Sequence, residues 1–444
     1  MFIKKFNLKI NNKSVKQSFI VCLGFSIAGL TRSATLTVGG DYRFGSNLYS
    51  NLDAGPGVRA GGGNTSTFWE TRLLVRPDIL IDDRFSFKNE FNLLQLKPRT
   101  QSSGAIQNDV PPDFGAPLDR TLGFESDSMG PVVRKAYLEW ASDWGLMRVG
   151  RQPKNWGLGI LYNSGSDPLN DYSTHVDRVG FQALLGNLGL HLGYEKSAEN
   201  SLNLDDDDAE VFEIALDYSN PEALFDVGML YSRGKRLPLA GLGLVSSHDF
   251  SIFSSRRWGS FQLGAEAASI DQEGAGSKLG VLTQIDWIPE AWNLGFDFAY
   301  ASANSTGNFA FHPNYQPFMI LFRQGLGPSR NTNQVRGGVS GANQVGGAVG
   351  EGSGAGALVA KARLLFNFDQ EKYKLGTDFG FAKLVNQGSN AGTSLGFETD
   401  IHLAHKWYKN FTMNYGLGLL FPSSALGQNT QTVWGFQLRG VLLF

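Results

Sequence analysis

The chain contains very little cysteine and few charged residues. Its only thiol is Cys22, and 18% of its 444 residues are charged, against about 25% in ordinary soluble domains. Disulfide bonds, cysteine-ligated metals and thiol catalysis are therefore excluded for everything after residue 22. Val21 precedes Cys22, where a lipoprotein signal would place glycine, alanine or serine, so lipid attachment at this cysteine is not predicted.

Acidic residues are missing from the first 34 residues, which hold six of the 39 lysines and arginines. The basic stretch MFIKKFNLKINNKSVKQ leads into an apolar run from Ser18 to Leu30, which is shorter than the roughly 20 residues of a membrane helix. This order predicts a cleaved secretory signal peptide. We place the cut after Ser33, within a window from Ala28 to Ala34, so that residues 1–33 are the signal and residues 34–444 the exported domain.

Two further features are missing from the exported domain: an excess of positive charge and any apolar run of membrane-helix length. Its formal net charge is −8, which predicts that nucleic acid is not a partner. If it crosses a membrane, strands must do so. With 55 glycines in 444 residues, the chain is poor in helix formers. A large barrel, a β-solenoid and a propeller all fit this composition.

Alternation of apolar and polar residues favours the barrel. The last segment, TVWGFQLRGVLLF, places Trp434, Phe436, Leu438, Gly440, Leu442 and Phe444 on one face and Gln437 and Arg439 on the other. The segments NFTMNYGLGLLF and WNLGFDFAYAS alternate in the same way, with aromatic residues near the strand ends. An apolar face with aromatic ends is typical of a strand whose outer side meets lipid and its two interfaces.

Similar segments predict about eighteen antiparallel strands. They begin near Thr35, Ser66, Arg84, Val132, Trp144, Arg178, Leu188, Ala209, Ala223, Gly243, Trp258, Lys278, Trp292, Gly356, Lys372, Leu395, Phe411 and Thr432. The segments at 144–151 and around 247–255 alternate poorly, so the alternative count is sixteen.

Short and long connections alternate along the chain, as expected for periplasmic turns and extracellular loops. The short connections are predicted at Pro77–Asp83, Ser142–Asp143, Gly186–Asn187, Ser219–Glu222, Ser255–Arg257, Pro289–Ala291, Asp369–Glu371 and Tyr408–Lys409. The prediction is an all-β, transmembrane antiparallel β-barrel in the outer membrane of a Gram-negative bacterium. Eighteen strands would close at a width of roughly 35 Å, too wide for wall side chains to fill.

Charged residues of both signs occupy the faces opposite the apolar ones and are expected to line the lumen. In addition to Asp41, the candidates are Arg43, Glu70, Arg72, Arg76, Lys88, Glu90, Arg178, Glu213, Asp217, Glu266, Asp286, Asp297, Lys361, Arg363, Lys374, Asp378, Glu398, Asp400 and Arg439. One interpretation is a transverse field that orients polar solutes; the other is a lattice of ion pairs that holds the wall.

The longest connection, residues 303–355, has an apolar and aromatic first half and a glycine-rich second half. Loops of this length are commonly functional or disordered. We therefore expect a lumen constriction built by Phe309, Phe311, Tyr315, Phe318 and Phe322, with a mobile external loop as the alternative.

A short motif resembles a known class of barrels. Gly150-Arg151-Gln152 leaves a strand and is followed by Trp156, Tyr162 and several glycines. This stretch resembles large monomeric alginate-export-type and related porin-like outer-membrane barrels. The resemblance implies a solute pathway, although the chain offers no continuous arginine lining of the kind that a polyanion exporter needs. We expect Trp156 and Tyr162 near the barrel mouth.

Enzymatic function is not predicted. His402 and His405 are three residues apart on one strand and therefore point to opposite faces. The acidic run Asp205–Asp208 is interpreted as a solvated loop, with calcium binding as the alternative. No cofactor is expected.

The expected function is passive or weakly selective diffusion of small hydrophilic solutes. A closed, surface-exposed barrel in adhesion or envelope structure is the alternative. The expected partners are outer-membrane lipid, lipopolysaccharide, small hydrophilic solutes and the barrel-assembly machinery, with Phe444 in the assembly signal.

Overall fold

The computed structural model describes most of the exported domain. The described residues are 34–50, 65–96, 132–170, 173–198, 209–236, 245–274, 276–304, 307–309, 311–312, 314–321, 356–369, 371–385, 393–423 and 431–444. The predicted signal peptide, the acidic run at 205–208 and Phe322 lie outside them.

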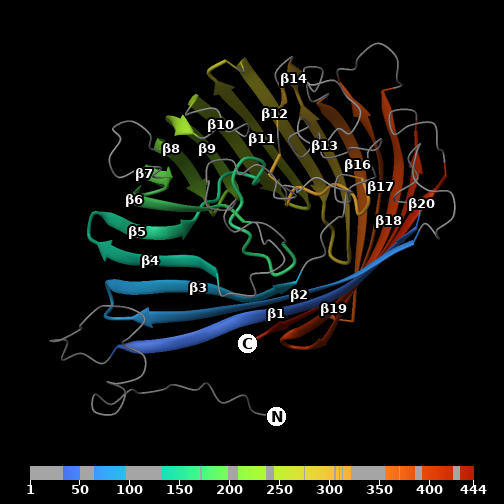
Figure 1. The fold of residues 1–444 in the computed structure, drawn as a ribbon, viewed down its shortest axis with the longest axis horizontal. Coiled ribbons are helices and arrows are strands. Elements are labelled where there is room, and N and C mark those ends of the chain that lie inside the picture. Colours follow the sequence, from blue (N-terminus) through green and yellow to red (C-terminus); the bar gives the residue numbers. More distant parts are fainter. Residues whose placement is uncertain are drawn as a thin grey trace.

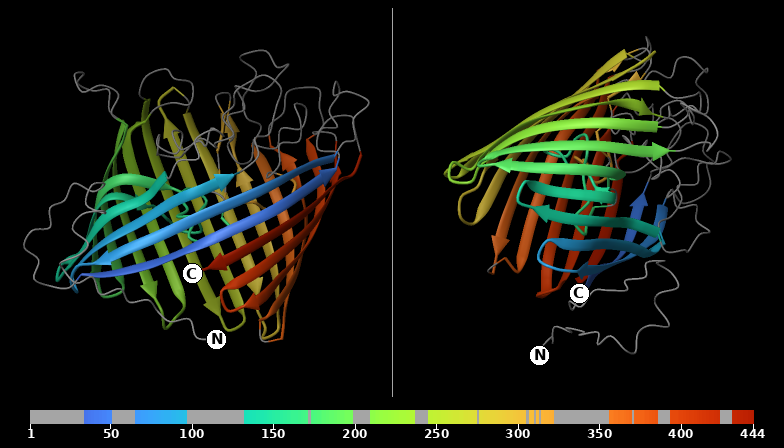
Figure 2. Two further views of the ribbon diagram at one scale, coloured as in Figure 1. Left: turned by 60° about the horizontal axis from the view of Figure 1, so that its bottom comes forward. Right: turned by 90° about the vertical axis from the view of Figure 1, so that its left-hand side faces the viewer.

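Eighteen strands form one antiparallel sheet that closes on itself as a barrel (Figures 1 and 2). They are β1 (Thr35–Ser50), β2 (Thr65–Leu80), β3 (Phe85–Leu96), β4 (Val132–Ser142), β5 (Gly145–Pro153), β6 (His175–Leu185), β7 (Leu188–Ala198), β8 (Ala209–Asn220), β9 (Phe225–Arg236), β10 (Val245–Trp258), β11 (Phe261–Gln272), β12 (Gly276–Trp287), β13 (Trp292–Ala301), β16 (Ala357–Phe368), β17 (Tyr373–Leu384), β18 (Ser394–Tyr408), β19 (Phe411–Pro422) and β20 (Val433–Leu443). A separate two-stranded hairpin consists of β14 (Ala303–Asn304) and β15 (Gly307–Asn308).

Closure occurs between the first and the last strand. Strand β1 pairs with β20 from Asp41↔Leu443 to Ser50↔Trp434. On its other side β1 pairs with β2 over its whole length. The eighteen-strand count is therefore confirmed, and the poorly alternating segments at 144–151 and 247–255 form β5 and most of β10.

The period of two determines which face each residue takes. On β19, Leu417 is 40% exposed on the outer face while Asn414 points inward, opposite Arg439 of β20. On β13, Phe296 and Phe298 are exposed outside and Asp297 is buried inside. The apolar outer surface and polar inner surface agree with the sequence prediction, because a wall between lipid and a polar lumen needs this alternation.

Eight short turns join the strands at one end of the barrel. Gly186 and Gly259 lie in two of these turns at φ 64° and 56°, a region that glycine reaches without a Cβ penalty. Several predicted turn residues belong to strands instead: Ser142 ends β4, Ser219 and Asn220 end β8, and Tyr408 ends β18. The two largest differences are at Pro77, which belongs to β2, and at Ser255–Arg257, which belong to β10, whose turn is at Gly259 and Ser260. In both places the strand pairing continues past residues that are frequent in turns.

Within the described ranges there is no helix with the length and hydropathy that would cross a bilayer.

Two connections fold into the lumen instead of staying at its rim. Of their described residues, we call 154–170 with 173–174 the first inner segment, and 309, 311–312 and 314–321 the second inner segment. In Figure 1 the green and gold traces inside the ring of strands belong to them. Their apolar side chains pack with lumen-facing wall residues into a buried cluster that includes Trp156, Tyr162, Phe311 and Leu282.

Candidate constriction in the barrel lumen

The first inner segment is a closed loop tied at its base. Lys154 N donates to the carbonyl of Thr174 at 2.9 Å, and Thr174 N donates to the carbonyl of Asn163 at 2.7 Å. Near its start, Trp156 N donates to the carbonyl of Tyr162 at 3.1 Å. These bonds pair buried backbone groups of the loop, which has no neighbouring strand to supply partners.

One side of this segment rests on acidic residues of strands β7 to β11, which we call the acidic sector: Glu195, Glu213, Asp249 and Glu266. Glu266 Oε2 accepts hydrogen bonds from Leu158 N at 2.7 Å and Ile160 N at 3.4 Å. The Tyr162 hydroxyl donates to Asp249 Oδ2 at 2.9 Å. Glu266 therefore holds the segment through backbone amides, and Asp249 holds it through a hydroxyl.

The buried Lys154 completes this attachment. Its Nζ lies 2.8 Å from Glu195 Oε1 and 2.5 Å from Glu213 Oε2, and 3.8 Å from the centre of the Tyr162 ring. Burial alone lowers the pKa of Lys154, but the two carboxylates outweigh burial and raise this pKa above its usual range. Lys154 therefore stays charged and fixes the start of the segment to the wall.

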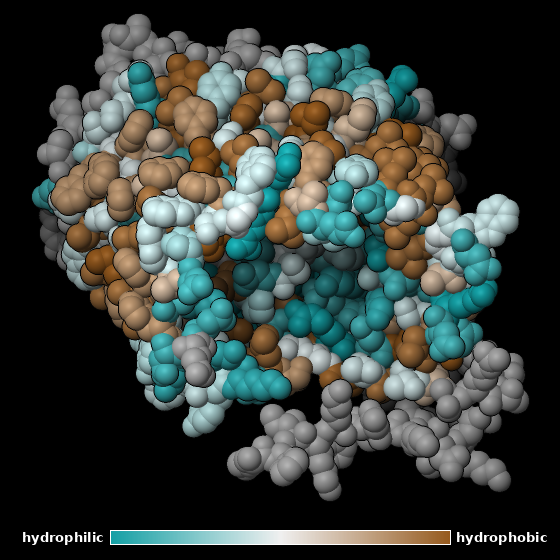
Figure 3. All heavy atoms as spheres, turned by 180° about the vertical axis from the view of Figure 1, so that it is seen from behind, coloured by the Kyte–Doolittle hydropathy of each residue, from teal (hydrophilic) through white to brown (hydrophobic). Residues whose placement is uncertain are grey.

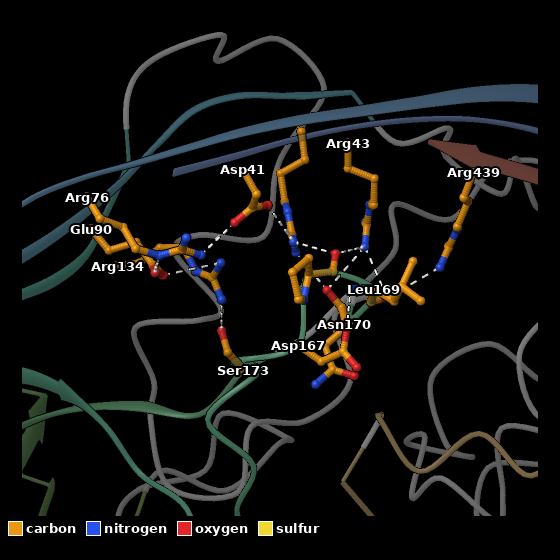
Figure 4. Close-up of polar contacts among 12 residues, drawn as sticks. Asp41, Arg43, Arg76, Glu90, Arg134, Asp167, Leu169, Asn170, Ser173 and Arg439 are labelled. Carbon is orange, nitrogen blue, oxygen red and sulfur yellow. Dashed lines mark hydrogen bonds and ion pairs between the residues drawn. The ribbon is translucent and has the colours of Figure 1, made fainter. Parts of the chain in front are cut away.

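The tip of the first inner segment reaches the opposite wall (Figure 4). Figure 4 shows Arg43 and Arg439 pointing from strands β1 and β20 toward backbone carbonyls of this tip, and Arg72 of β2 donates to the same stretch. Arg43 donates to Leu169 O at 3.1 Å and Arg72 to Pro168 O at 2.8 Å and Asn170 O at 2.7 Å. The segment therefore crosses the lumen from one side to the other.

Positive residues outnumber negative ones on this side. We call it the basic sector, and it comprises Arg43, Arg72, Arg76, Arg134, Lys135 and Arg439 with the acids Asp41, Glu70 and Glu90. Arg76 bonds to Asp41 Oδ2 at 2.5 Å and Glu90 Oε2 at 2.7 Å while its side chain stays 32% exposed. Glu90 also forms ion pairs with Arg134 and Lys135. Strands β1–β3 and β8–β11 lie on opposite sides of the ring in Figure 1, so the two sectors face each other across the lumen.

The second inner segment is held by two adjacent acids of β18. Glu398 accepts from Ile320 N at 2.6 Å and Leu321 N at 2.7 Å, and Asp400 accepts from Met319 N at 2.9 Å. Phe309 packs against Gly280, where a Cβ would lie 2.1 Å from the ring. Because Gly280 has no side chain, the Phe309 ring fits against β12 at this position.

The two inner segments also bind each other. His312 N donates to Ile160 O at 2.7 Å, and Asn314 Nδ2 donates to Asn163 Oδ1 at 3.1 Å. Together they occupy part of the lumen, while Figure 3 shows a hollow lined by hydrophilic residues that remains open to view from one end. The arrangement narrows the barrel without a uniform apolar seal.

All the charged positions predicted for the lumen lie on the inner face. Several form ion pairs: Arg178 with Glu213 at 3.1 Å, Arg363 with Asp286 and Asp297 at 3.0 Å each, Lys361 with Asp378 at 3.6 Å, and Lys88 with Asp78 at 3.3 Å. Asp217 forms a hydrogen bond with His191. Lys374 shares the inner face of β17 with Asp378. Their effect on a passing solute stays a prediction.

The predicted constriction residues lie inside the barrel as far as they are described. Phe309, Phe311 and Phe318 are buried, and Tyr315 packs against Phe311 at a centroid distance of 4.9 Å. Burial raises the pKa of the Tyr315 hydroxyl. These side chains are buried in the lumen, and their role as a constriction stays a prediction.

Sequence reasoning missed the larger role of the first inner segment. Trp156 and Tyr162, expected at the mouth, are buried inside the lumen. The ring centroids of Trp156 and Phe253 are 5.2 Å apart in an edge-on contact. The signal was present in the apolar stretch WGLGILY at 156–162, since a solvated connection has no reason to be this apolar.

Comparison with protein families finds one match. A family model described as Gram-negative porin matches residues 20–340. None of the curated protein sequences is significantly similar to the chain.

Solved outer-membrane structures share the fold at low sequence identity. OccK9 (OpdG) from Pseudomonas aeruginosa is 11% identical, with a TM-score of 0.55 over 92% of this chain and 98% of that one. A BenF-like porin from Pseudomonas fluorescens Pf-5 is 10% identical, with a TM-score of 0.55 and the same two coverages of 92% and 98%. OpdL from Pseudomonas aeruginosa is 12% identical, with a TM-score of 0.54 over 92% and 98%.

Proposed function

The chain belongs to the Gram-negative porin family and is an outer-membrane channel for small solutes, and from this premise we propose that solutes pass a constriction formed by the two inner segments. The observation that carries the proposal is the attachment of the first inner segment to both walls. Glu266 holds its start and Arg72 holds its tip. A crossing segment reduces the cross-section that a wide barrel otherwise leaves open.

The charges around this constriction favour weak selectivity among hydrophilic solutes. The basic sector has six cations and three acids by the residues named above, while the acidic sector faces it across the lumen. Side chains in the passage, such as the part-exposed Arg76, are available to a solute. A separation of charge across a narrow polar passage orients a dipolar solute and reduces the entry of wholly apolar ones.

Planar-bilayer recording of the purified chain tests this function. Discrete conductance steps are expected in symmetric salt, with a unit conductance well below that of an empty barrel of the same width. Addition of small polar solutes should reduce the current in proportion to their occupancy of the passage. A folded, heat-modifiable chain that never conducts would contradict the proposal and support the closed barrel of adhesion or envelope structure.

Two partners belong to the same proposal. Lipopolysaccharide forms the outer leaflet around such a barrel, and the barrel-assembly machinery inserts the chain by recognising its last strand. Support comes from the lipid-facing row Trp434, Phe436 and Leu442, which ends at Phe444. Cleavage of residues 1–33 as a signal peptide and the lack of a catalytic role complete the proposal; the porin match favours a channel over an enzyme.

A further inference from the structure

Charged side chains gather on the outer face of strands β5 to β11, at the end of the barrel that carries the long connections. We call this surface the charged belt. It consists of Arg151, Asp177, Lys196, Glu210, Arg233, Lys235, His248 and Asp271.

Strand register makes these residues neighbours. Asp177 lies opposite Arg151, Glu210 opposite Lys196, and His248 opposite both Arg233 and Asp271. Arg151 binds Asp177 through two hydrogen bonds of 2.9 and 2.7 Å. The signs alternate along most of the belt, and directly opposed unlike charges are the stable arrangement on a sheet face.

The belt lies at the depth where hydrocarbon gives way to headgroups. One pleat or two toward the membrane centre, the outer face changes to the exposed rings of Tyr194, Phe212, Tyr231 and Phe250. Two of these rings reach up into the belt: the Tyr194 hydroxyl donates to Glu210 at 2.7 Å, and the Tyr231 hydroxyl lies 2.9 Å from His248 Nδ1. Aromatic rings with polar tips mark a membrane interface.

Seven other strands lack such a belt over their described residues. At the same end, the outer faces of β1, β2, β13, β17, β18, β19 and β20 carry residues such as Trp69, Tyr300, Phe397, Phe421 and Trp434. Among the described residues of those strands, Lys383 is the one charged side chain on that outer rim. An interface boundary alone therefore does not require the belt.

We propose that the charged belt is a binding surface for lipopolysaccharide. This inference deepens the proposed outer-leaflet partner and rests on it. The phosphates of lipopolysaccharide are bridged by divalent cations, so the molecule offers anionic oxygens and bound metal ions side by side. Arg233, Lys235 and Lys196 match the phosphates, while Glu210 and Asp271 match the bridging cations.

The mixed signs and the exposed rings select this partner over a plain anionic phospholipid. A surface that only attracts anionic headgroups gains from a uniformly basic cluster, and the acidic members of the belt would oppose that attraction. The exposed rings of Phe212 and Phe250 below the belt supply the apolar surface on which acyl chains pack. The belt therefore matches both ends of an acylated, cation-bridged sugar phosphate.

The test uses the full exported chain, refolded without lipopolysaccharide in detergent. Purified lipopolysaccharide is added with Mg²⁺, and bound molecules per barrel are counted by native mass spectrometry. The combined variant Lys196→Gln, Arg233→Gln and Lys235→Gln should bind at least tenfold more weakly than the unaltered chain. The matched control Lys383→Gln, on the same rim but outside the belt, should bind like the unaltered chain.

Removal of Mg²⁺ by EDTA should weaken binding to the unaltered chain, and Glu210→Gln should remove most of that dependence.

Equal binding by the combined variant and the unaltered chain would overturn the proposed role of the belt. An equal loss of lipopolysaccharide binding in the Lys383 control would overturn it as well. If the combined variant does not fold, Arg233→Gln alone replaces it, because its side chain is exposed on the surface. Bilayer conductance of the same samples separates this inference from the channel. Conduction without belt-dependent binding overturns the belt only, while belt-dependent binding by a barrel that never conducts overturns the channel only.

Discussion

Gly157 determines how closely the first inner segment approaches the wall. Its φ of 52° lies in the left-handed region, and an added Cβ would be 2.8 Å from the Glu266 carboxyl carbon and 3.0 Å from Phe253 Cβ. Only a residue without a Cβ allows Leu158 and Ile160 to share the same carboxylate. The contact of the segment with Glu266 therefore depends on the absence of a Cβ at Gly157.

Gly157→Ala should loosen the first inner segment and destabilise the protein by about 1 to 3 kcal/mol. The measurement is heat unfolding followed by electrophoretic mobility, together with current noise in the open channel, which should increase. Gly186→Ala is the control, because this turn glycine has a similar φ of 64° but open space around the added Cβ. Equal noise in both variants would mean that backbone strain alone, and not the contact with Glu266, explains the change.

A single lipid-facing residue tests the assignment of the two wall surfaces. Leu417→Arg places a charge on the outer face of β19 and should cost about 2 to 4 kcal/mol if it lies near the midplane. Asn414→Arg places the same charge on the lumen face, beside Arg439, and should be tolerated at a smaller cost. Denaturant titration in lipid vesicles measures both. Equal penalties would mean that the face assignment on this strand is wrong.

At the scale of elements, the sequence predicts the strands far better than the path of the connections. Predicted strand starts agree with the structure within about three residues, since the period-two pattern and the turn dipeptides are local signals. The direction of a connection is not local. The first inner segment enters the lumen because Glu266, Asp249 and Arg72 meet it from strands far away in sequence, and only closure of the barrel brings those strands together.

Charged lumen residues show the same limit. Alternation places Glu398 and Arg439 on the inner face, but it does not show whether a charged side chain forms an ion pair or binds the backbone of an inner segment. Arg439 pairs with Glu70, whereas Glu398 binds backbone amides of the second inner segment. The partner of a charge depends on which segment fills the lumen beside it.

Excision of residues 308–350 should leave the barrel folded and raise its single-channel conductance. The second inner segment contributes lumen packing rather than wall pairing, since β13 and β16 still pair from Trp292↔Phe366 to Ala301↔Ala357. Removal also opens space beside the first inner segment at Ile160. Conductance in planar bilayers measures the effect.

A shorter excision, residues 329–350, is the control for loop length. It retains Phe309 to Leu321 with their clamps on Glu398 and Asp400, so its conductance should match that of the full chain. A rise of equal size in both variants would show that the glycine-rich half, and not the buried segment, limits the current.

At the scale of the whole molecule, barrel closure involves the last residue. Phe444 N donates to Gly40 O at 3.1 Å, and Gly40 N donates to Phe444 O at 2.9 Å. Deletion of Phe444 removes both bonds and the terminal aromatic of the lipid-facing row. The variant should yield less folded, heat-modifiable protein and insert more slowly into vesicles. Phe421→Ala is the control, because this residue is also an exposed outer aromatic but lies at the opposite end of the barrel. Unchanged insertion kinetics for the deletion would contradict an assembly role.

The distribution of charge over the lumen is the property that distinguishes a selective passage from a wall held by ion pairs. Arg76 is the sharpest position for this test, because it belongs to the basic sector and its side chain is 32% exposed to the passage. If the transverse field acts on permeating ions, Arg76→Gln should shift the reversal potential in a salt gradient toward cation preference. The shift should shrink as salt rises from 0.01 M to 1 M, where the screening length falls from about 30 Å to about 3 Å. Arg256→Gln serves as control, since Arg256 is a cation on the outer face that stacks on Trp258 at 4.9 Å. A reversal potential that does not move in Arg76→Gln, or that moves equally in both variants, would mean that the lumen charges act only as a lattice of ion pairs.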